Sequence, residues 1–330
     1  MCGFLIAYSK NNFKTSQDIK NKFRLNLSLL NDRGPDETSV LEFKNFLIGF
    51  NRLNINNIKD GSQPFVSKSK RYLICFNGEI VNYKKLIKFL IKKKIKLYKE
   101  SEAEVILALY LLYKNKCLNY LKGMFSFVII DKINETIFSA TDRFGIKPLY
   151  YGYLDNNNCF YLTSNFSSLV ETGLIRKKPN YQAIKSFLSF GQVYDSNTLI
   201  CNVKDLKNGN FLEYSKKGIL IKKYWLPKFK KNKEINNKIL LEKTINKLKD
   251  YIKDWKTSEE KLSLCLSDGV DSQILLSLLT QNDKKLETFT IGLTPNQVLS
   301  HSDKNNNFID FDLTKSLKLF RKFAKKNYIL

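Results

Sequence analysis

The chain opens with MCGFLIAY at residues 1–8. The apolar run of residues 3–8 predicts a first strand, and Cys2 stands directly before it. If Met1 is removed, which the small Cys2 side chain permits, Cys2 becomes the amino-terminal residue. Its own α-amino group, with a pKa of about 8, can then act as the general base that activates the thiol. The alternative is that Cys2 is only a buried small residue on the first strand.

The histidine content restricts the chemistry open to the chain. Only one histidine, His301, occurs among the 330 residues, in a polar loop of the second half. A Cys-His or Ser-His arrangement in the first part of the chain is therefore excluded. An amino-terminal nucleophile needs no histidine, so this class of site remains open.

Three further segments carry polar groups beside predicted strands. RGPD at residues 33–36 is a rigid turn with two charges, and RLNI at residues 52–55 places an arginine beside a strand. NGEIVNY at residues 77–83 places the amide of Asn77, the backbone of Gly78, which has no side chain, and the carboxylate of Glu79 at a strand end. The Asn77 side chain and the Gly78 N–H could together supply the donors of an oxyanion hole. Each segment alone could be an ordinary turn, but with the cysteine they form a specific combination.

The same segments supply charges that suit a glutamine molecule. Its α-carboxylate needs a cation and its α-ammonium needs an anion. Arg52 suits the first role, and Glu79 or Glu102 suits the second.

These motifs resemble glutamine-dependent asparagine synthetase from residue 1 to about residue 292. They are, in order, MCGF at 1–4, RGPD at 33–36, RLxI at 52–55, GxQP at 61–64, NGEIxNY at 77–83, GMFxF at 123–127 and DRFGIKPLYY at 142–151. The resemblance implies an α+β first domain over residues 2–225, a glutamine amidotransferase with the αββα fold of amino-terminal nucleophile enzymes. Cys2 would be the nucleophile, and Asn77 and Gly78 would form the oxyanion hole. The implied glutamine contacts are Arg52, Leu53, Ile55, Asn77, Gly78, Glu79 and Glu102.

Two positions depart from the family pattern near the implied glutamine site. Glu102 stands where the family usually has aspartate, so the contact to the ammonium group would come from a longer side chain. Asn54 stands where the family usually has serine.

The pattern changes after a polar, lysine-rich linker at residues 226–237. A strand at 262–266, a helix at 271–279, a strand at 286–291 and a helix at 313–326 follow in alternation. This order predicts an α/β domain at residues 238–330 that begins a parallel sheet. We expect the domain to be incomplete, with a third strand beginning only at YIL, residues 328–330.

The loop SDGVDS at residues 267–272 lies between the first of these strands and a helix. Backbone N–H groups at such a helix start can hold a pyrophosphate, aided by serine hydroxyls, and Asp271 could hold Mg²⁺. The loop resembles that of ATP pyrophosphatases, with Asp268 in place of a glycine, so that an extra carboxylate would repel phosphate. The alternative is a capped helix start without a ligand. The nucleotide-site residues implied by the resemblance are Cys265, Ser267, Asp268, Gly269, Val270, Asp271, Ser272 and Ile291.

The resemblance implies a complete reaction for the family. Ammonia from glutamine reaches the second site internally, where ATP with Mg²⁺ has adenylated aspartate, and asparagine forms. The implied partners are therefore glutamine, ATP and aspartate, and a homodimer is compatible with the family. This chain is expected to lack a complete synthetase half.

Bulk properties bear on location and on the alternatives. The formal net charge is +25, but the lysines are dispersed along the whole chain and no aromatic-basic RNA-binding signature accompanies them. The six cysteines form no C-x-x-C pair, and no apolar run approaches the length of a membrane span. We expect a cytoplasmic protein. A stand-alone glutaminase with a degenerate nucleotide loop is the alternative function, followed by a basic RNA-binding or RNA-modifying protein.

Overall fold

The computed structural model describes residues 1–10, 17–55, 61–154, 159–229, 236–255, 262–267, 269–280, 286–290 and 326–329. The chain divides into two compact units, Met1–Lys230 and Lys231–Leu330. Each unit has sheets of its own.

Two six-stranded antiparallel sheets form the centre of the first unit. The first sheet has the order β10 (Val203–Asp205), β8 (Tyr150–Leu154), β9 (Cys159–Thr163), β1 (Gly3–Tyr8), β3 (Phe46–Arg52), β2 (Glu37–Phe43). The second has the order β12 (Gly218–Lys223), β11 (Asn210–Ser215), β7 (Thr136–Thr141), β6 (Gly123–Asp131), β5 (Tyr72–Ile80), β4 (Phe65–Val66).

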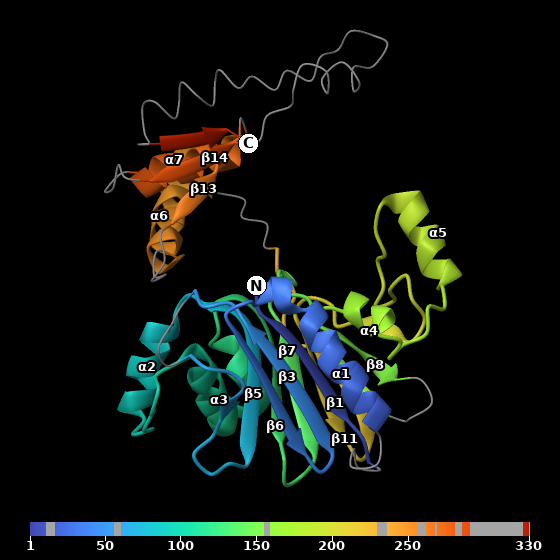
Figure 1. Ribbon diagram of the computed structural model, residues 1–330. Helices are drawn as coiled ribbons and strands as arrows, with labels where there is room; N and C mark the ends of the chain where they lie inside the picture. The colour runs from blue at the N-terminus through green and yellow to red at the C-terminus, as the bar shows by residue number, and fades with distance from the viewer. Residues whose placement is uncertain are drawn as a thin grey trace, which may run out of the picture. The chain divides into compact units, whose positions relative to one another are not determined.

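Helices cover the outer face of each sheet (Figure 1). The first sheet carries α1 (Gln17–Leu29) and α4 (Ser167–Glu171), and the second carries α2 (Tyr83–Lys92) and α3 (Glu102–Tyr113). The remaining helices of this unit are η2 (Asn31–Arg33), η3 (Lys114–Asn119) and α5 (Tyr181–Phe190). The predicted αββα architecture is confirmed.

The opening strand shows why this architecture needs such an apolar sequence. Phe4, Ile6 and Tyr8 pack between the two sheets, while Leu5 and Ala7 pack on the other face with residues of α1. Because successive side chains of a strand point to opposite faces, a strand buried on both faces is apolar at every position. The strand at residues 3–8 therefore lies in one of the two inner layers of the sandwich, with packing on both of its faces.

The start of α3 carries one half of a capping box, with Ser101 as its N-cap residue. The Ser101 hydroxyl accepts the Glu104 N–H at 3.3 Å. The Glu104 carboxylate does not return the contact to Ser101, as a capping box would require. It accepts instead from the N–H groups of Tyr98, Lys99 and Glu100, which fixes the loop before the helix.

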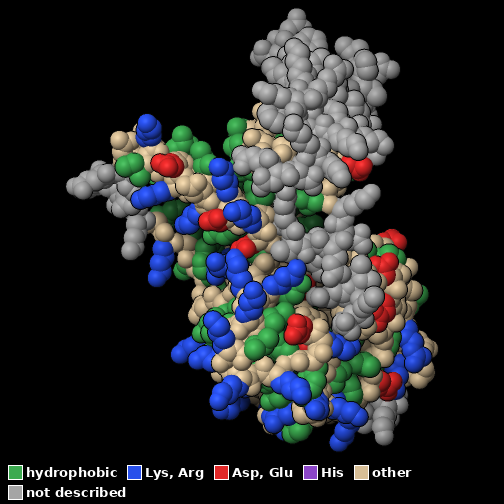
Figure 2. Space-filling view, turned by 90° about the vertical axis from the view of Figure 1, so that its left-hand side faces the viewer, with side chains coloured by type: hydrophobic (Ala, Val, Ile, Leu, Met, Phe, Trp, Pro, Cys, Tyr) green, Lys and Arg blue, Asp and Glu red, His purple; other side chains and the backbone are tan. Residues whose placement is uncertain are grey.

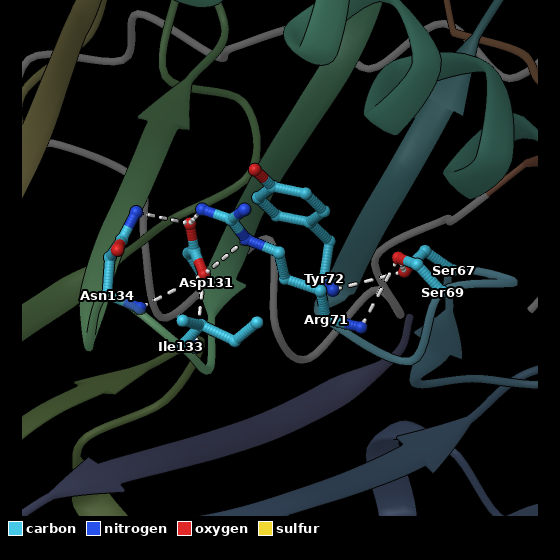
Figure 3. Close-up of polar contacts among 7 residues, drawn as sticks. All are labelled: Ser67, Ser69, Arg71, Tyr72, Asp131, Ile133 and Asn134. Carbon is cyan, nitrogen blue, oxygen red and sulfur yellow. Dashed lines mark hydrogen bonds and ion pairs between the residues drawn. The ribbon is translucent and has the colours of Figure 1, made fainter.

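A polar network ties the turn between β4 and β5 to the turn between β6 and β7 (Figure 3). Arg71 donates from Nε and Nη2 to the two Asp131 oxygens, at 3.0 and 2.7 Å. Asp131 also accepts the N–H groups of Ile133 and Asn134. Burial of Asp131 acts in the opposite direction, but these donors hold the pKa of its carboxyl below the usual value.

Asp131→Asn is expected to lower the free energy of unfolding by about 1–3 kcal/mol near neutral pH, because charge-assisted bonds are lost. A carboxyl with a depressed pKa stabilises the fold above its unfolded pKa of about 4, and this contribution is lost as the pH falls further. The two proteins should therefore converge in urea denaturation near pH 3. Asp18→Asn, in an exposed pair with Lys22, is the control and should change stability by less than about 1 kcal/mol. Equal losses in both variants would contradict a special role for Asp131.

The second unit contains a three-stranded parallel sheet in the order β13 (Ser263–Cys265), β14 (Glu287–Thr290), β15 (Lys326–Ile329). Its helices are α6 (Asn237–Trp255) and α7 (Val270–Thr280). The predicted order of strand, helix and strand is confirmed. The helix predicted at 313–326 is wrong at its last residue, because Lys326 pairs with Glu287 in the third strand. Residues 313–325 lie outside the described residues.

The described part of the chain also shows the character of its helices and the distribution of charge on one face. None of its helices combines the length and the apolar character that crossing a membrane requires. Figure 2 shows Lys and Arg side chains spread over the visible face, with apolar and acidic side chains between them. On this face the positive charge is dispersed rather than gathered in one stripe.

Candidate active site

A cavity of about 100 Å³ in the first unit is lined by residues from both sheets and from α3. Every residue that we predicted from the sequence to bind or hydrolyse glutamine lines this cavity. These are Cys2, Arg52, Leu53, Ile55, Asn77, Gly78, Glu79 and Glu102. Residues that are up to 100 positions apart in the sequence thus form one site.

Cys2 precedes β1, and its sulfur faces the end of β3. The Cys2 Sγ lies 3.4 Å from the Leu53 backbone nitrogen, whose N–H it accepts. Burial raises the pKa of the Cys2 thiol, while the Leu53 N–H and the charges of the amino terminus, Arg52 and Lys147 act in the opposite direction. A thiol with a raised pKa needs a base before it can act as a nucleophile.

Met1 still precedes Cys2 in this chain, and it also lines the cavity. Burial is the main cause that lowers the pKa of the Met1 amino group. An amino group with a lowered pKa is a neutral base at a lower pH. The same environment would act on the amino group of Cys2 after removal of Met1.

The turn at residues 33–36 positions the nucleophile and its neighbours. Arg33 Nε donates to the Cys2 carbonyl at 3.4 Å, and Asp36 accepts the Asn54 N–H at 2.7 Å. A Cβ on Gly34 would lie 2.3 Å from the Asn51 carbonyl oxygen, so only glycine allows this approach. Arg33 therefore fixes the backbone at Cys2, and Asp36 fixes the backbone directly after Leu53.

Asn77 has the property expected of an oxyanion-hole donor. Its side chain is only 1% exposed, and its Nδ2 has no hydrogen-bond partner among the described residues. Buried donors are almost always paired, because an unpaired one costs about 1–3 kcal/mol. An unpaired donor at the wall of a cavity indicates that a ligand supplies the acceptor.

Gly78 lines the cavity, and its N–H points to the side of β5 that faces away from β6. Gly78 lies opposite Phe125, but the Phe125 N–H donates to the Asp142 carboxylate at 3.1 Å and the Phe125 carbonyl accepts the Asp142 N–H at 2.8 Å. Gly78 and Phe125 are thus a non-hydrogen-bonded pair, so the Gly78 N–H points away from β6. The φ of Gly78 is 148°, and a Cβ at this position would lie 2.1 Å from the Met124 carbonyl oxygen, so this residue must be glycine.

Charged groups surround the remaining walls of the cavity. Arg52 is 4% exposed and its Nη1 lies 3.5 Å from Glu37 Oε2. Glu102 opens α3 and accepts the Ile80 N–H. Burial, together with the nearby Glu79, raises the pKa of Glu102 to about 8. The cavity is thus lined by two cationic side chains, Arg52 and Lys147, and by two carboxyl groups, and a zwitterionic amino acid requires charges of both signs.

Lys147 lines the cavity and was not assigned a role from the sequence. It is 8% exposed. Burial lowers the pKa of Lys147, and Glu79 is the strongest influence in the opposite direction. Its position inside DRFGIKPLYY was the available signal, but no local pattern indicated that this lysine is buried beside Glu79 and Cys2. Gln63, inside GxQP, is a second lining residue that sequence reasoning missed.

The loop after β13 in the second unit is held by its two serines. Ser267 Oγ and Ser272 Oγ lie 3.1 Å apart, and the Gly269 N–H donates to Ser267 Oγ at 3.3 Å. Cys265 and Asp271 are exposed, and α7 begins at Val270. Asp268 and Ile291 lie outside the described residues. Within the described ranges no group of three His, Cys, Asp or Glu side chains could hold a metal ion, so Asp271 as a Mg²⁺ ligand stays a prediction.

The sequence of the chain is similar to those of known proteins. Residues 1–225 match the family model of a glutamine amidotransferase domain. Asparagine synthetase [glutamine-hydrolyzing] 1 of Bacillus subtilis (strain 168) is 30% identical over 293 residues, which are 88% of this chain and 46% of that protein. A putative asparagine synthetase [glutamine-hydrolyzing] 2 of Methanocaldococcus jannaschii is 30% identical over 320 residues, 88% of this chain and 60% of that protein. The chain spans about half the length of the curated relatives it matches.

A solved structure with a similar fold is described as the allosteric regulatory enzyme of purine biosynthesis. It has a TM-score of 0.50 and 12% sequence identity, over 99% of this chain and 80% of that chain. At this identity the likeness concerns the fold alone.

Proposed function

The chain belongs to the class II glutamine amidotransferase family, and on this premise we propose that its Cys2 site hydrolyses glutamine to glutamate and ammonia. The observation that carries the proposal is the Asn77 amide, which is buried and unpaired in the cavity that also contains Cys2. A substrate oxyanion would supply the acceptor that Asn77 lacks.

The reaction requires that Cys2 is the first residue of the mature chain. Its free amino group takes the thiol proton while the sulfur forms a bond to the amide carbon of glutamine. The carbonyl oxygen becomes an oxyanion, which accepts from Asn77 Nδ2 and the Gly78 N–H. The carbon–nitrogen bond then breaks, and the amide nitrogen takes the proton and leaves as ammonia. Water attacks the remaining thioester, releases glutamate and restores the thiol.

The two ends of glutamine are assigned to the charged walls of the cavity. Arg52 binds the α-carboxylate, and Glu102, with Glu79 beside it, binds the α-ammonium. Leu53 and Ile55 contact the rest of the molecule. Support comes from the lining of one cavity by all five residues.

The wider function that we propose is of the asparagine synthetase type, on the basis of the relatives named above. The hydroxyls of Ser267 and Ser272 and the Gly269 N–H lie at the start of α7, where they bond within the loop, and they would turn to a pyrophosphate group when it binds. ATP with Mg²⁺, when bound, would supply the activation of a carboxylate such as that of aspartate. Asp268 adds a negative charge to this loop, which weakens the fit.

Steady-state glutamate release from glutamine by the full chain tests the proposal, and we expect release without ATP or aspartate. A second arm adds ATP, Mg²⁺ and aspartate. Asparagine formed in proportion to glutamate would support the wider function, and glutamate alone would limit the chain to hydrolysis. No glutamate in either arm would contradict the proposed function.

Glu102 should make glutamine binding pH-dependent. A carboxyl with a pKa of about 8 is largely protonated at pH 6, and the neutral form cannot balance an ammonium group. The KM for glutamine should therefore fall as the pH rises from about 6 to about 8. Glu102→Gln should remove this dependence and raise KM at the upper end by roughly 10–100-fold, the value of a charged hydrogen bond.

Glu100→Gln is the matched control, because Glu100 precedes the same helix but is exposed. It should keep the wild-type profile. A wild-type KM that stays constant over this pH range, with Glu102→Gln indistinguishable from it, would show that Glu102 does not bind the ammonium group.

A further inference from the structure

Among the residues that the structure describes, no strand lies beside the edge of β5 at the oxyanion hole. β4 pairs with β5 only at Phe65–Ile74 and Val66–Leu73. Phe76 lies two residues beyond the last of these pairs, with backbone groups that point to the same edge. Without another partner, this N–H and this carbonyl would be buried and unpaired.

The side chain of Gln63 takes the place of the missing strand. Its Oε1 accepts the Phe76 N–H at 2.7 Å, and its Nε2 donates to the Phe76 carbonyl at 3.0 Å. A primary amide can donate and accept at once, so it reproduces both bonds of a strand pair. The next residues along the strand are Asn77 and Gly78, which carry the two oxyanion donors.

The backbone of Gln63 is bonded to the other sheet. Its carbonyl accepts from the hydroxyl of Ser39, which lies on β2. Cys2 precedes β1 of that same first sheet, whereas Asn77 lies on the second sheet. Gln63 therefore connects the sheet that carries the nucleophile with the sheet that carries the oxyanion donors.

We propose that Gln63 is a positioning residue, which acts through Phe76 to hold Asn77 and Gly78 at the correct distance from Cys2. The inference rests on the proposed glutamine hydrolysis. Oxyanion donors are effective only when they are fixed before the reaction. A strand edge released at Phe76 would let the two donors shift, which weakens transition-state stabilisation more than it weakens substrate binding.

The variants Gln63→Met and Gln63→Glu test this role in the full chain. Met keeps the length of the side chain and removes both hydrogen bonds. Glu keeps an acceptor for the Phe76 N–H but turns a carboxylate oxygen toward the Phe76 carbonyl. Both should lower kcat about 10–100-fold, the cost of a misplaced catalytic group, with KM changed less than about threefold. Gln17→Met, at an exposed position on α1, is the control and should match the wild type.

Alkylation of Cys2 by iodoacetamide separates the oxyanion hole from the thiol. In this displacement the sulfur–carbon bond forms as iodide leaves, and no carbonyl oxyanion develops. The alkylation rate of the Gln63 variants should therefore remain within about twofold of the wild type while kcat falls.

Two results would overturn the positioning role. The first is a wild-type kcat in both Gln63 variants, and the second is a parallel loss of kcat and alkylation rate, which would indicate damage to the thiol or the fold. A wild-type chain that releases no glutamate is a different outcome, because it contradicts the proposed hydrolysis and the inference with it.

Discussion

The Cys2→Ala chain is expected to release glutamate from glutamine about 10⁴-fold more slowly than the wild type, or not measurably. In the proposed reaction the Cys2 thiol forms the only covalent bond between the protein and the substrate, and an alanine side chain cannot form it. The fold should be retained, because the cavity needs only a small side chain at this position. Tm and far-UV circular dichroism should therefore match those of the wild type.

A second half-buried cysteine provides the control for this substitution. Cys201 is partly exposed, and its sulfur lies 3.3 Å from the Pro179 carbonyl, outside the cavity. Cys201→Ala should leave the rate of glutamate release unchanged. Retained release in Cys2→Ala, or an equal loss in both variants, would contradict the assignment of the nucleophile.

Asn77→Leu is expected to lower kcat by about 10²–10³-fold, the usual cost of one oxyanion-hole donor. Because Asn77 Nδ2 has no partner among the described residues, replacing it breaks no hydrogen bond of that donor. The free energy of unfolding should therefore stay constant or rise, since an unpaired buried donor is removed. Loss of activity without loss of stability is the signature of a donor that is reserved for a substrate.

Asn82→Leu is the matched control, because this buried amide is fully engaged in the fold. Its Nδ2 donates to the Tyr120 carbonyl and its Oδ1 accepts the Lys122 N–H, both at 3.0 Å. This variant should lose about 1–3 kcal/mol of stability and keep more of its activity than Asn77→Leu. A larger stability loss in Asn77→Leu than in Asn82→Leu would mean that Asn77 serves the fold rather than the reaction.

The groups that react with the substrate could be predicted from the sequence more completely than the residues that hold those groups in position. Cys2, Asn77 and Gly78 lie in short motifs whose residue types already indicate the chemistry. Gln63 lies in such a motif too, but its role depends on where β4 ends and on how Ser39 approaches from the other sheet. Contacts of this kind form only when distant strands come together.

Burial was the second property that the sequence could not provide. Glu102 is a carboxyl group whatever its surroundings, but its high pKa results from its burial and from the nearby Glu79, while the Ile80 N–H acts in the opposite direction. Lys147 likewise looks like an ordinary lysine in a basic chain. Its lowered pKa results from its burial beside Glu79.

The fold could be predicted where the pattern was strong. The range predicted for β1, residues 3–8, agrees with the structure at both ends. The helix α1 and the strand β2 were not singled out, because their sequences are mixed. β2 alternates between exposed and half-buried positions at the sheet edge, and α1 contributes only four buried residues to the core. Edge elements carry a weaker apolar signal than elements in the middle of the sandwich.

The most direct measurement uses a glutamine analogue whose amide is replaced by a diazomethyl ketone. Its terminal carbon takes the thiol proton and forms a bond to the Cys2 sulfur as dinitrogen leaves, and the adduct is located by mass spectrometry of the peptides. We expect an amino-terminal peptide that begins at Cys2, without Met1, and that carries one adduct, and we expect excess glutamine to prevent the modification. An adduct on the exposed Cys265 with Cys2 unmodified, or glutamine hydrolysis by a chain that retains Met1, would contradict the proposed role of Cys2.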